Sequence, residues 1–336
     1  MIWFRRAALL AVVLTACGSQ ADERGPLRMN EIQVLGSHNS YKLAMPAETF
    51  QALSRRNPET ARALEYTHLP LTEQLDLGVR KLELDVFYDP DGSLFPGRTT
   101  ASGSRFPVLH VQNLDDRSTC PDLLTCLREV AAWSAAHPDH VPVFLSFNAK
   151  DEAIDQPGFL LPLPFGEDAW LAMDAEIRSV LAEKLIEPRS VIGNDGPVWP
   201  LLDAARGRFV TILDEGGSKR ATYASRWAER AMFANLPEGE PGAAILIVND
   251  PLADFERIQR LVRSGYIVRT RADADTREAR SGDTTRREAA FASGAQLVST
   301  DYYLPADHFG TGYVVELPGG MRCNPLLRPP TCRLTE

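Results

Sequence analysis

The chain contains 336 residues, 45 of them acidic and 36 basic, and its net charge is −9. No run of Lys and Arg interrupts this acidic background, which argues against a nucleic-acid-binding protein. The length allows two domains, but α/β barrels of about 250 residues or more also fold as one domain.

The first residues predict an export signal that is not part of the fold. Arg5 and Arg6 precede the short apolar segment Ala7–Leu14, and Leu-Thr-Ala-Cys follows at 14–17. This order is typical of a secretion signal. The segment is too short to span a bilayer, which needs about 20 residues.

The Leu-Thr-Ala-Cys sequence also resembles a bacterial lipobox, in which the cysteine is lipidated and becomes the first residue of the mature protein. We therefore predict a lipoprotein signal peptide over residues 1–16, lipidation at Cys17 and a linker over 17–30. The alternative is an ordinary signal with a chance cysteine near its end. Under the first interpretation the protein is exported and lipid-anchored to a bacterial membrane, in the outer membrane or periplasm, or facing the outside.

Eight short apolar or alternating segments follow, and each is a predicted strand. They are Ile32–Gly36, Arg80–Phe87, Phe106–Val111, Val141–Asn148, Arg208–Leu213, Ala244–Val248, Tyr266–Thr270 and Ala295–Thr300.

Amphipathic segments with apolar residues every three or four positions lie between several of these strands. They are Cys126–His137, Ala169–Leu185, Leu252–Ser264 and Thr284–Ser293. Strands that alternate with helices indicate a parallel sheet, and eight such units favour a closed barrel. The fold class is therefore α/β, a TIM-like (β/α)8 barrel formed by one domain over residues 31–336.

The segment after Tyr303 is irregular and contains the last two of five cysteines. Without Cys17 four remain, an even number that suits an oxidising compartment. The nearest pairs are Cys120–Cys126 and Cys323–Cys332. Two cysteines six apart within one helix would lie about 9 Å apart, beyond disulfide reach. Pro121 indicates that the helix begins after Cys120, which makes the first bridge possible, and the second would staple the C-terminal tail.

Polar residues gather at the carboxyl ends of the predicted strands, where barrel enzymes have their active sites. Glu83 and Asp85 are two residues apart in an apolar strand, so both side chains point to the same side. Two inward carboxylates are costly to bury unless a cation compensates them, and Ca²⁺ takes such oxygen ligands. The alternative is a structural ion pair with Arg80 or Lys81.

Two of the six histidines, His38 and His110, lie at predicted strand ends. Imidazole titrates near neutral pH, so a pair on different strands suits general acid–base catalysis. His68, His137 and His140 lie in loops or turns, where we expect packing or surface roles.

Several of these motifs resemble one known family in their order. They are Gly-Ser-His-Asn-Ser-Tyr at 36–41, Leu-Glu-Leu-Asp-Val at 82–86 and Val-Leu-His-Val at 108–111, together with the Cys120 and Cys126 segments and Lys150-Asp151. The set is similar to the bacterial calcium-dependent phosphatidylinositol-specific phospholipase C family. The resemblance runs from Glu31 to Asp151, and beyond it mainly the strand order and Asp301-Tyr302 contribute.

The resemblance implies a barrel of the PLC-like phosphodiesterase type that cleaves a phosphodiester beside an inositol hydroxyl. His38 and His110 would be the catalytic pair, and the inositol 2-hydroxyl would be the nucleophile. Ca²⁺ would be held by Asn39, Glu83 and Asp85. Its partners would be a phospholipid or inositol phosphodiester substrate and, through the lipid anchor, a membrane surface; we expect a monomer that binds no nucleic acid.

Other site residues are more ambiguous. Where the family often has a glutamate at the end of the fourth strand, this chain has Asn148, whose amide oxygen carries no negative charge; Asp151 is the alternative ligand. Lys150 and Arg271 are candidates for phosphate contacts, or else loop charges. Tyr302 or Tyr303 would lie against a sugar-like ring, or else pack at the barrel rim.

Two other functions remain open from the sequence. One is a glycerophosphodiester phosphodiesterase of the same architecture, which would use water as the nucleophile. The other is a catalytically inactive lipoprotein that binds an inositol or sugar ligand. Asn148 favours both alternatives. The two histidines and the paired carboxylates argue against the inactive lipoprotein.

Overall fold

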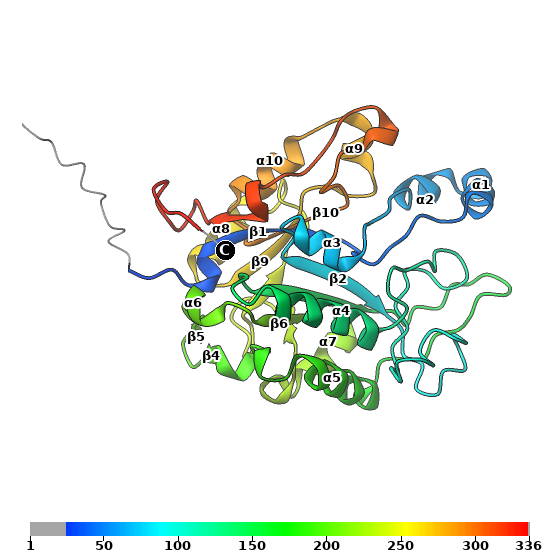
Figure 1. Ribbon diagram of the computed structural model, residues 1–336, viewed down its shortest axis with the longest axis horizontal. Helices are drawn as coiled ribbons and strands as arrows, with labels where there is room; N and C mark the ends of the chain where they lie inside the picture. The colour runs from blue at the N-terminus through cyan, green and yellow to red at the C-terminus, as the bar shows by residue number, and fades with distance from the viewer. Residues whose placement is uncertain (1–24, 335–336) are drawn as a thin grey trace, which may run out of the picture.

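The computed structural model describes residues 25–334 and shows a nearly closed barrel of parallel strands with helices around it (Figure 1). Eight parallel strands run in the order β7-β6-β3-β2-β1-β10-β9-β8. Their bounds are β1 Ile32–Ser37, β2 Lys81–Val86, β3 Val143–Ala149, β6 Phe209–Leu213, β7 Phe233–Ala234, β8 Ile245–Ile247, β9 Ile267–Arg271 and β10 Leu297–Thr300. Within residues 25–334 no ladder joins β7 to β8, so the barrel has one seam.

The α-helices lie in the connections between these strands. Their bounds are α1 Ala47–Arg56, α2 Pro58–Ala63, α3 Leu71–Asp76, α4 Leu123–Ala136, α5 Glu167–Leu181, α6 Leu202–Ala205, α7 Gly217–Ala224, α8 Phe255–Arg263, α9 Arg277–Ser281 and α10 Thr285–Ala292. The four amphipathic segments predicted from the sequence correspond to α4, α5, α8 and α10. None of the helices in residues 25–334 is long and apolar enough to cross a bilayer. The proposed signal peptide and Cys17 lie outside the described residues.

One predicted strand is wrong. Residues 106–111 form only isolated antiparallel bridges, such as Val86 with Val108 and Val111 with Asp115. Pro107 has no backbone N–H for a ladder, and the segment crosses the end of β2 in the opposite direction. The eighth barrel strand is instead β7, which has only two residues and gave no signal in the sequence.

The side chains inside the barrel change in character along its axis. Near the amino ends of the strands they are apolar and form one buried cluster that includes Val34, Phe144, Val210, Ile267 and Leu297. Further along the same strands the alternating positions carry charged or polar groups. The barrel therefore has a closed apolar end and a polar end, and the polar end is where the strands terminate.

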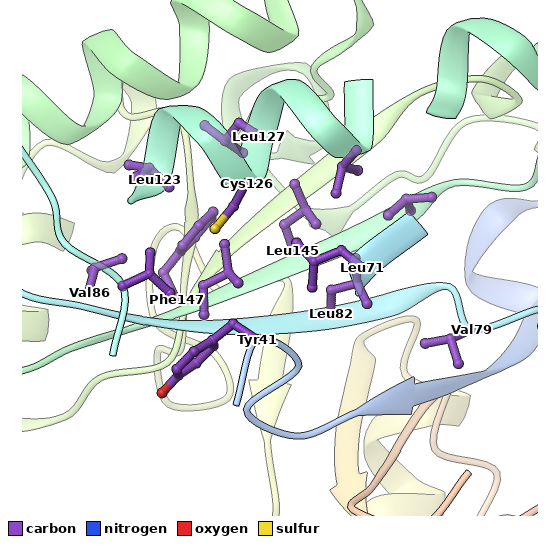
Figure 2. Packing of buried hydrophobic residues seen from close by; sticks show 14 of the residues in the cluster. Tyr41, Leu71, Val79, Leu82, Val86, Leu123, Cys126, Leu127, Leu145 and Phe147 are labelled. Atoms are coloured by element: carbon purple, nitrogen blue, oxygen red, sulfur yellow. The ribbon is translucent and has the colours of Figure 1, made fainter. Parts of the chain in front are cut away.

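The outward face of the sheet packs against α3 and α4. Figure 2 shows Leu123 and Leu127 of α4 above Leu145 and Phe147 of β3. Asp122 caps α4 by accepting a hydrogen bond from Thr125 N at 2.9 Å. Burial of such side chains contributes roughly 1.5–3 kcal/mol each and fixes the strands that carry the polar groups.

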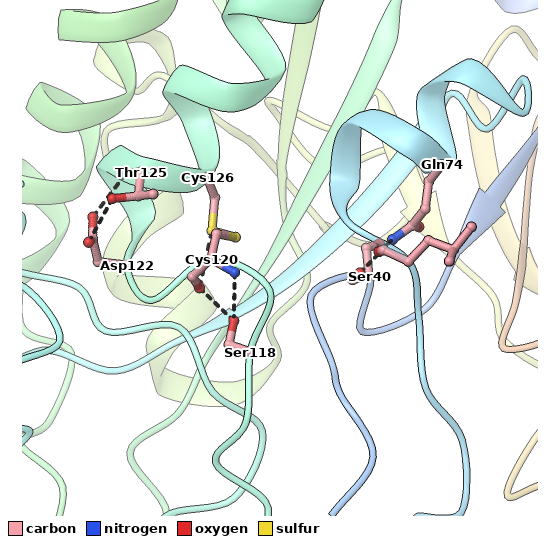
Figure 3. The surroundings of a disulfide bond; sticks show 8 residues. Ser40, Gln74, Ser118, Cys120, Asp122, Thr125 and Cys126 are labelled. Atoms are coloured by element: carbon pink, nitrogen blue, oxygen red, sulfur yellow. Dashed lines mark hydrogen bonds between the residues drawn. A yellow bond between two sulfur atoms is a disulfide. The ribbon is translucent and has the colours of Figure 1, made fainter.

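Both predicted disulfides are present. Cys120 lies in the loop before α4 and Cys126 lies in its first turns, with their Cα atoms 5.3 Å apart (Figure 3). Cys323 and Cys332 close a loop in the C-terminal tail, with Cα atoms 6.1 Å apart. Strand β11 (Met321–Cys323) pairs antiparallel with the start of β1, so this loop anchors the tail to the barrel.

Candidate active site

The turn that follows β1 holds His38. Asn39 takes a left-handed conformation with φ 46°, which turns the chain sharply after the histidine. Ser37 Oγ donates to Gln74 Oε1 at 2.6 Å. Gln74 Nε2 donates to Ser40 O at 2.6 Å (Figure 3). Helix α3 therefore fixes both sides of this turn, and His38 has little freedom to move.

His38 is partly exposed and forms a dyad with the buried Asp301. Its Nδ1 lies 2.8 Å from Asp301 Oδ1, and 18% of the His38 side chain is exposed against 1% for Asp301. A hydrogen bond from Nδ1–H to this carboxylate leaves Nε2 with a lone pair. His38 Nε2 lies 3.7 Å from Glu83 Oε1. The histidine can thus accept a proton at Nε2 while Asp301 stabilises the resulting charge.

Burial and charge set the protonation of this dyad. Burial, followed by the nearby Arg271 cation, lowers the pKa of His38, although Asp301 and Glu83 oppose the shift. Burial alone would raise the pKa of Asp301, but His38 and Arg271 hold it at about 2. At neutral pH this favours a neutral imidazole beside a carboxylate, which is the state required of a general base.

His110 forms a second dyad, within one loop. It lies between β2 and α4, not at the end of a barrel strand as predicted. Its Nδ1 lies 2.8 Å from Asp115 Oδ2, and backbone hydrogen bonds between Val111 and Asp115 close the turn. Of the His110 side chain 16% is exposed, whereas Asp115 is buried. Its Nε2 is the ring nitrogen left to face a ligand.

Lys42 connects the two histidine loops. It follows His38 by four residues, and its Nζ lies 3.4 Å from Asp115 Oδ2. The ammonium also donates to Leu64 O and Tyr66 O, both at 3.0 Å, and lies 4.4 Å from the centre of the Tyr66 ring. Burial lowers the pKa of Lys42, and Asp115 counteracts that effect. Sequence reasoning missed Lys42 and Asp115, because the ion pair depends on how two loops fold together.

Glu83 lies inside the barrel among cations. Its Oε2 lies 2.8 Å from Arg269 Nη2 and also bonds Lys81 Nζ. Strands β2 and β9 are not neighbours, so the contact with Arg269 crosses the barrel interior. Burial would raise the pKa of Glu83, but Lys81 and Arg269 lower it. The ion pair with Lys81 that the sequence left open is therefore present, whereas Arg80 donates to Leu75 O.

Asp85 has a different environment. It is buried, and Lys150 Nζ lies 3.0 Å from its Oδ2. Within residues 25–334 neither of its oxygens accepts a hydrogen bond of ordinary geometry. Asp85 pairs in register with Asn148 on β3. Asn148 Nδ2 donates to Asp214 O at 2.8 Å, so its amide oxygen is the end left for a cation.

The other predicted residues lie at differing distances from this centre. Arg271 Nη2 lies 3.3 Å from Asp301 Oδ2, which places its guanidinium beside the His38 dyad. Asp151 instead pairs with Lys219 at 2.9 Å, in a cluster with Glu152 and Glu215. Tyr302 is buried, and its ring packs edge-on against Tyr313 with ring centres 5.9 Å apart.

Comparison with known proteins decides the family. The sequence profile of the Ca²⁺-dependent phosphoinositide phospholipase C family matches residues 27–325. The chain belongs to this family. No curated protein matches it in sequence.

Solved structures of phosphoinositide phospholipases C share the fold. A calcium-dependent phosphoinositol-specific enzyme from a Pseudomonas species, in a complex with myo-inositol, is 17% identical with a TM-score of 0.55, over 89% of this chain and 96% of that one. A Ca²⁺-dependent phosphatidylinositol-specific enzyme from Streptomyces antibioticus is 18% identical with a TM-score of 0.53, over 84% and 97% of the two chains. Such identities establish a common fold alone.

The residues expected to bind calcium fit a hard cation. Asp85 has a buried oxygen, Oδ1, without a hydrogen bond, while Lys150 Nζ lies 3.0 Å from its Oδ2, and Asn148 offers an amide oxygen across the ladder. Such carboxylate and amide oxygens are the ligands that Ca²⁺ prefers. Among residues 25–334 no three His, Cys, Asp or Glu side chains cluster as a metal site.

Proposed function

We propose that the chain is an exported, calcium-assisted phospholipase C that cleaves phosphatidylinositol-type phosphodiesters. The two histidine dyads carry the proposal. Each imidazole has its Nδ1 bound to a buried carboxylate and its Nε2 left for a ligand. One dyad can take up a proton while the other gives one away, as an in-line displacement at phosphorus requires.

His38 is the general base in this mechanism. It lies beside Glu83 and Arg271 in the charged centre of the barrel, and its lowered pKa keeps the imidazole neutral. The proton of the inositol 2-hydroxyl moves to His38 Nε2, and the hydroxyl oxygen forms a bond to phosphorus. Asp301 stabilises the imidazolium and fixes its tautomer, while Arg271 adds positive charge beside the phosphate.

His110 is the general acid. Its Nε2 gives a proton to the leaving glyceride oxygen as the bond between that oxygen and phosphorus breaks. The products are a cyclic inositol phosphate and a diacylglycerol. Asp115 orients the imidazole, and Lys42 is a positioning residue that holds Asp115 in place.

Calcium would be held by Asn39, Glu83, Asp85 and Asn148, and when bound it would lower the pKa of the hydroxyl and neutralise phosphate charge. The side-chain cations Lys150 and Arg269 would also help to neutralise the phosphate charge. Lys150 lies at Asp85 and Arg269 at Glu83, so the same two carboxylates organise both sources of positive charge.

The decisive experiment is a product assay. Phosphatidylinositol and glycerophosphoinositol are each incubated with the protein, with Ca²⁺ and with EDTA, and the phosphorus-containing products are identified by NMR. A cyclic inositol phosphate supports the proposal. Direct release of glycerol phosphate would instead indicate a glycerophosphodiester phosphodiesterase, and absence of turnover with every substrate would indicate a binding protein.

Export and lipidation at Cys17 are part of the same proposal. Two disulfides within the barrel domain suit an oxidising compartment. Wild-type protein should partition with membranes when it is expressed with its leader. The substitution Cys17→Ser should move it to the soluble fraction, and a variant that stays in the membrane fraction would contradict lipidation.

A further inference from the structure

An apolar cavity lies beside His110. It has a volume of about 850 Å³, within the range of ligand sites, and lies between helices α1 and α2 and the loops that follow β2 and β3. We call it the hairpin groove, because the consecutive helices α1 and α2, the hairpin, form one of its walls. Its apolar lining includes Leu53, Leu64, Val111, Leu114, Ile154 and Phe159, and threonine and amide side chains such as Thr49 and Gln156 line much of the remainder. His110 forms part of the same wall, so the groove is continuous with the proposed general acid.

Helix α1 presents an apolar side that the protein does not bury. None of its ten residues is buried. Leu53, which lines the hairpin groove, and Phe50, which lines a second cavity, are only partly covered. Figure 1 shows α1 and α2 apart from the helices that pack on the barrel. A helix with an apolar face normally packs that face on a core. An exposed apolar face beside a catalytic residue marks a ligand groove.

The charge of the lining suits an uncharged chain. Arg56 is the one Lys or Arg residue among its lining residues, and no carboxylate lines the groove in the described part of the chain. This contrasts with the barrel centre, where Glu83, Asp85 and Asp301 lie within a few ångströms of cations. The phosphate and its inositol belong to the charged centre, and the groove suits the part of a substrate that carries no charge.

We propose that the hairpin groove binds an acyl chain of the leaving diacylglycerol, and thereby selects acylated over deacylated phosphodiesters. This rests on the proposed function, because His110 must protonate the leaving oxygen. Val111 and Leu114 line the groove together with His110, so a glyceride whose oxygen lies at His110 Nε2 would place a chain against them. Leu53 of α1 and Phe159 line the same groove.

A second apolar cavity fits this role less well. It has a volume of about 480 Å³ and is lined by residues such as Met45, Phe50 and Tyr303. Its α1 residues differ from those that line the hairpin groove. It borders Asp301 and His68, whose side chains are buried behind the His38 imidazole. The leaving oxygen is not on that side, so we assign the acyl chain to the groove at His110.

The test uses soluble short-chain substrates, so that membrane binding plays no part. Values of kcat/KM are measured for glycerophosphoinositol, dibutyroyl- and dihexanoyl-phosphatidylinositol below their aggregation concentrations. Complete burial of two further methylenes of one chain would raise kcat/KM about tenfold. Leu53→Ser and Phe159→Ser, on opposite walls, should each reduce this chain-length ratio several-fold, whereas Leu171→Ser should not, because Leu171 is 48% exposed on α5 and outside the groove.

Each outcome decides one of the two proposals. Turnover that is equal for all three substrates overturns the groove and leaves the phospholipase function intact. A chain-length ratio that survives both substitutions also overturns it, and so does chain-length dependence that occurs only with vesicles. Absence of turnover with every substrate overturns the proposed function itself. Leu53 is partly exposed on α1, so that variant should fold, and its melting temperature is compared with the wild type.

Discussion

The two histidine dyads are built in opposite ways. His38 and Asp301 are 263 residues apart in the sequence and meet because β1 and β10 pair in parallel. His110 and Asp115 are five residues apart and meet inside one turn. The first dyad exists only in the folded barrel, whereas the second is local, with one long-range support from Lys42.

Under the proposed mechanism this difference matches a division of tasks between a general base, His38, and a general acid, His110. The base needs a controlled charge environment, and the barrel interior supplies it through Arg271, Glu83 and Asp301. The acid needs a place beside the leaving group, where a loop can be adapted to the substrate. We therefore expect substitutions around His38 to change the pH dependence of kcat/KM, and substitutions around His110 to change the magnitude of kcat.

The largest expected effect tests whether both dyads are catalytic. His38→Ala and His110→Ala should each lower kcat by about 10³-fold, because each removes a proton-transfer step. Circular dichroism and melting temperature should change little, since both side chains are partly exposed. A variant of either kind that retains more than a tenth of wild-type turnover would remove that histidine from the mechanism.

Replacing the carboxylate of each dyad compares their construction directly. Asp301→Asn should cost about 10²-fold in kcat, because it removes the charge that stabilises the His38 imidazolium. Asp115→Asn should cost nearer 10-fold, because the backbone of the turn still holds His110. If Asp115→Asn is as harmful as Asp301→Asn, the local dyad is not self-supporting and the comparison fails.

Lys42 tests the one long-range support of the second dyad. Lys42→Met should lower kcat by roughly tenfold with little change in KM, because it frees Asp115 and with it His110. Lys42→Arg should restore much of the rate, since the positive charge is kept. Equal losses in both variants, with a lower melting temperature, would show that Lys42 serves stability alone.

The dependence of activity on Ca²⁺ distinguishes the carboxylates inside the barrel, Glu83 and Asp85, from Asp115 in the His110 loop. Glu83→Gln and Asp85→Asn should raise the Ca²⁺ concentration for half-maximal activity by about tenfold or more, because each removes a negative ligand. Asp115→Asn is the matched control, since this buried carboxylate lies at His110, and should leave that concentration unchanged. Wild-type activity that persists unchanged in EDTA would exclude a role for calcium.

The smallest expected effect concerns pH. Neutral His38 is the active form and burial lowers its pKa, so the acid limb of kcat/KM should lie below about pH 6.5. Arg271 also lowers this pKa, so Arg271→Gln should raise it and move the limb to higher pH. A limb that stays in place, or moves to lower pH, would contradict the electrostatic role of Arg271.

The sequence predicted what depends on local pattern. Alternation located seven of the eight barrel strands, and the spacing of Glu83 and Asp85 correctly placed both on one face of β2. Pro121 correctly indicated a helix start compatible with the first disulfide. Strand β7 was not predicted, because a strand of two residues has no detectable periodicity. Residues 106–111 were wrongly predicted as a strand, because an apolar segment beside a proline resembles one.

Contacts between distant segments could not be predicted. Nothing in the sequence links Lys42 to Asp115 or Arg269 to Glu83, because each pair is created by the packing of separate loops or strands. The same holds for Asp301, which the sequence placed at a strand end but did not pair with His38. The sequence identified His38 and His110 as candidate catalytic residues, although only His38 follows a barrel strand, and the partners of both became visible only in the fold.

The pairing of β11 with β1 has a consequence for the order in which the enzyme becomes active. Strand β1 leads directly to His38, Asp301 follows β10, and the tail closes over the start of β1 through Cys323. Translation delivers these C-terminal elements last. During synthesis His38 is therefore made long before Asp301, so the His38–Asp301 dyad can form only after nearly the whole barrel has been translated.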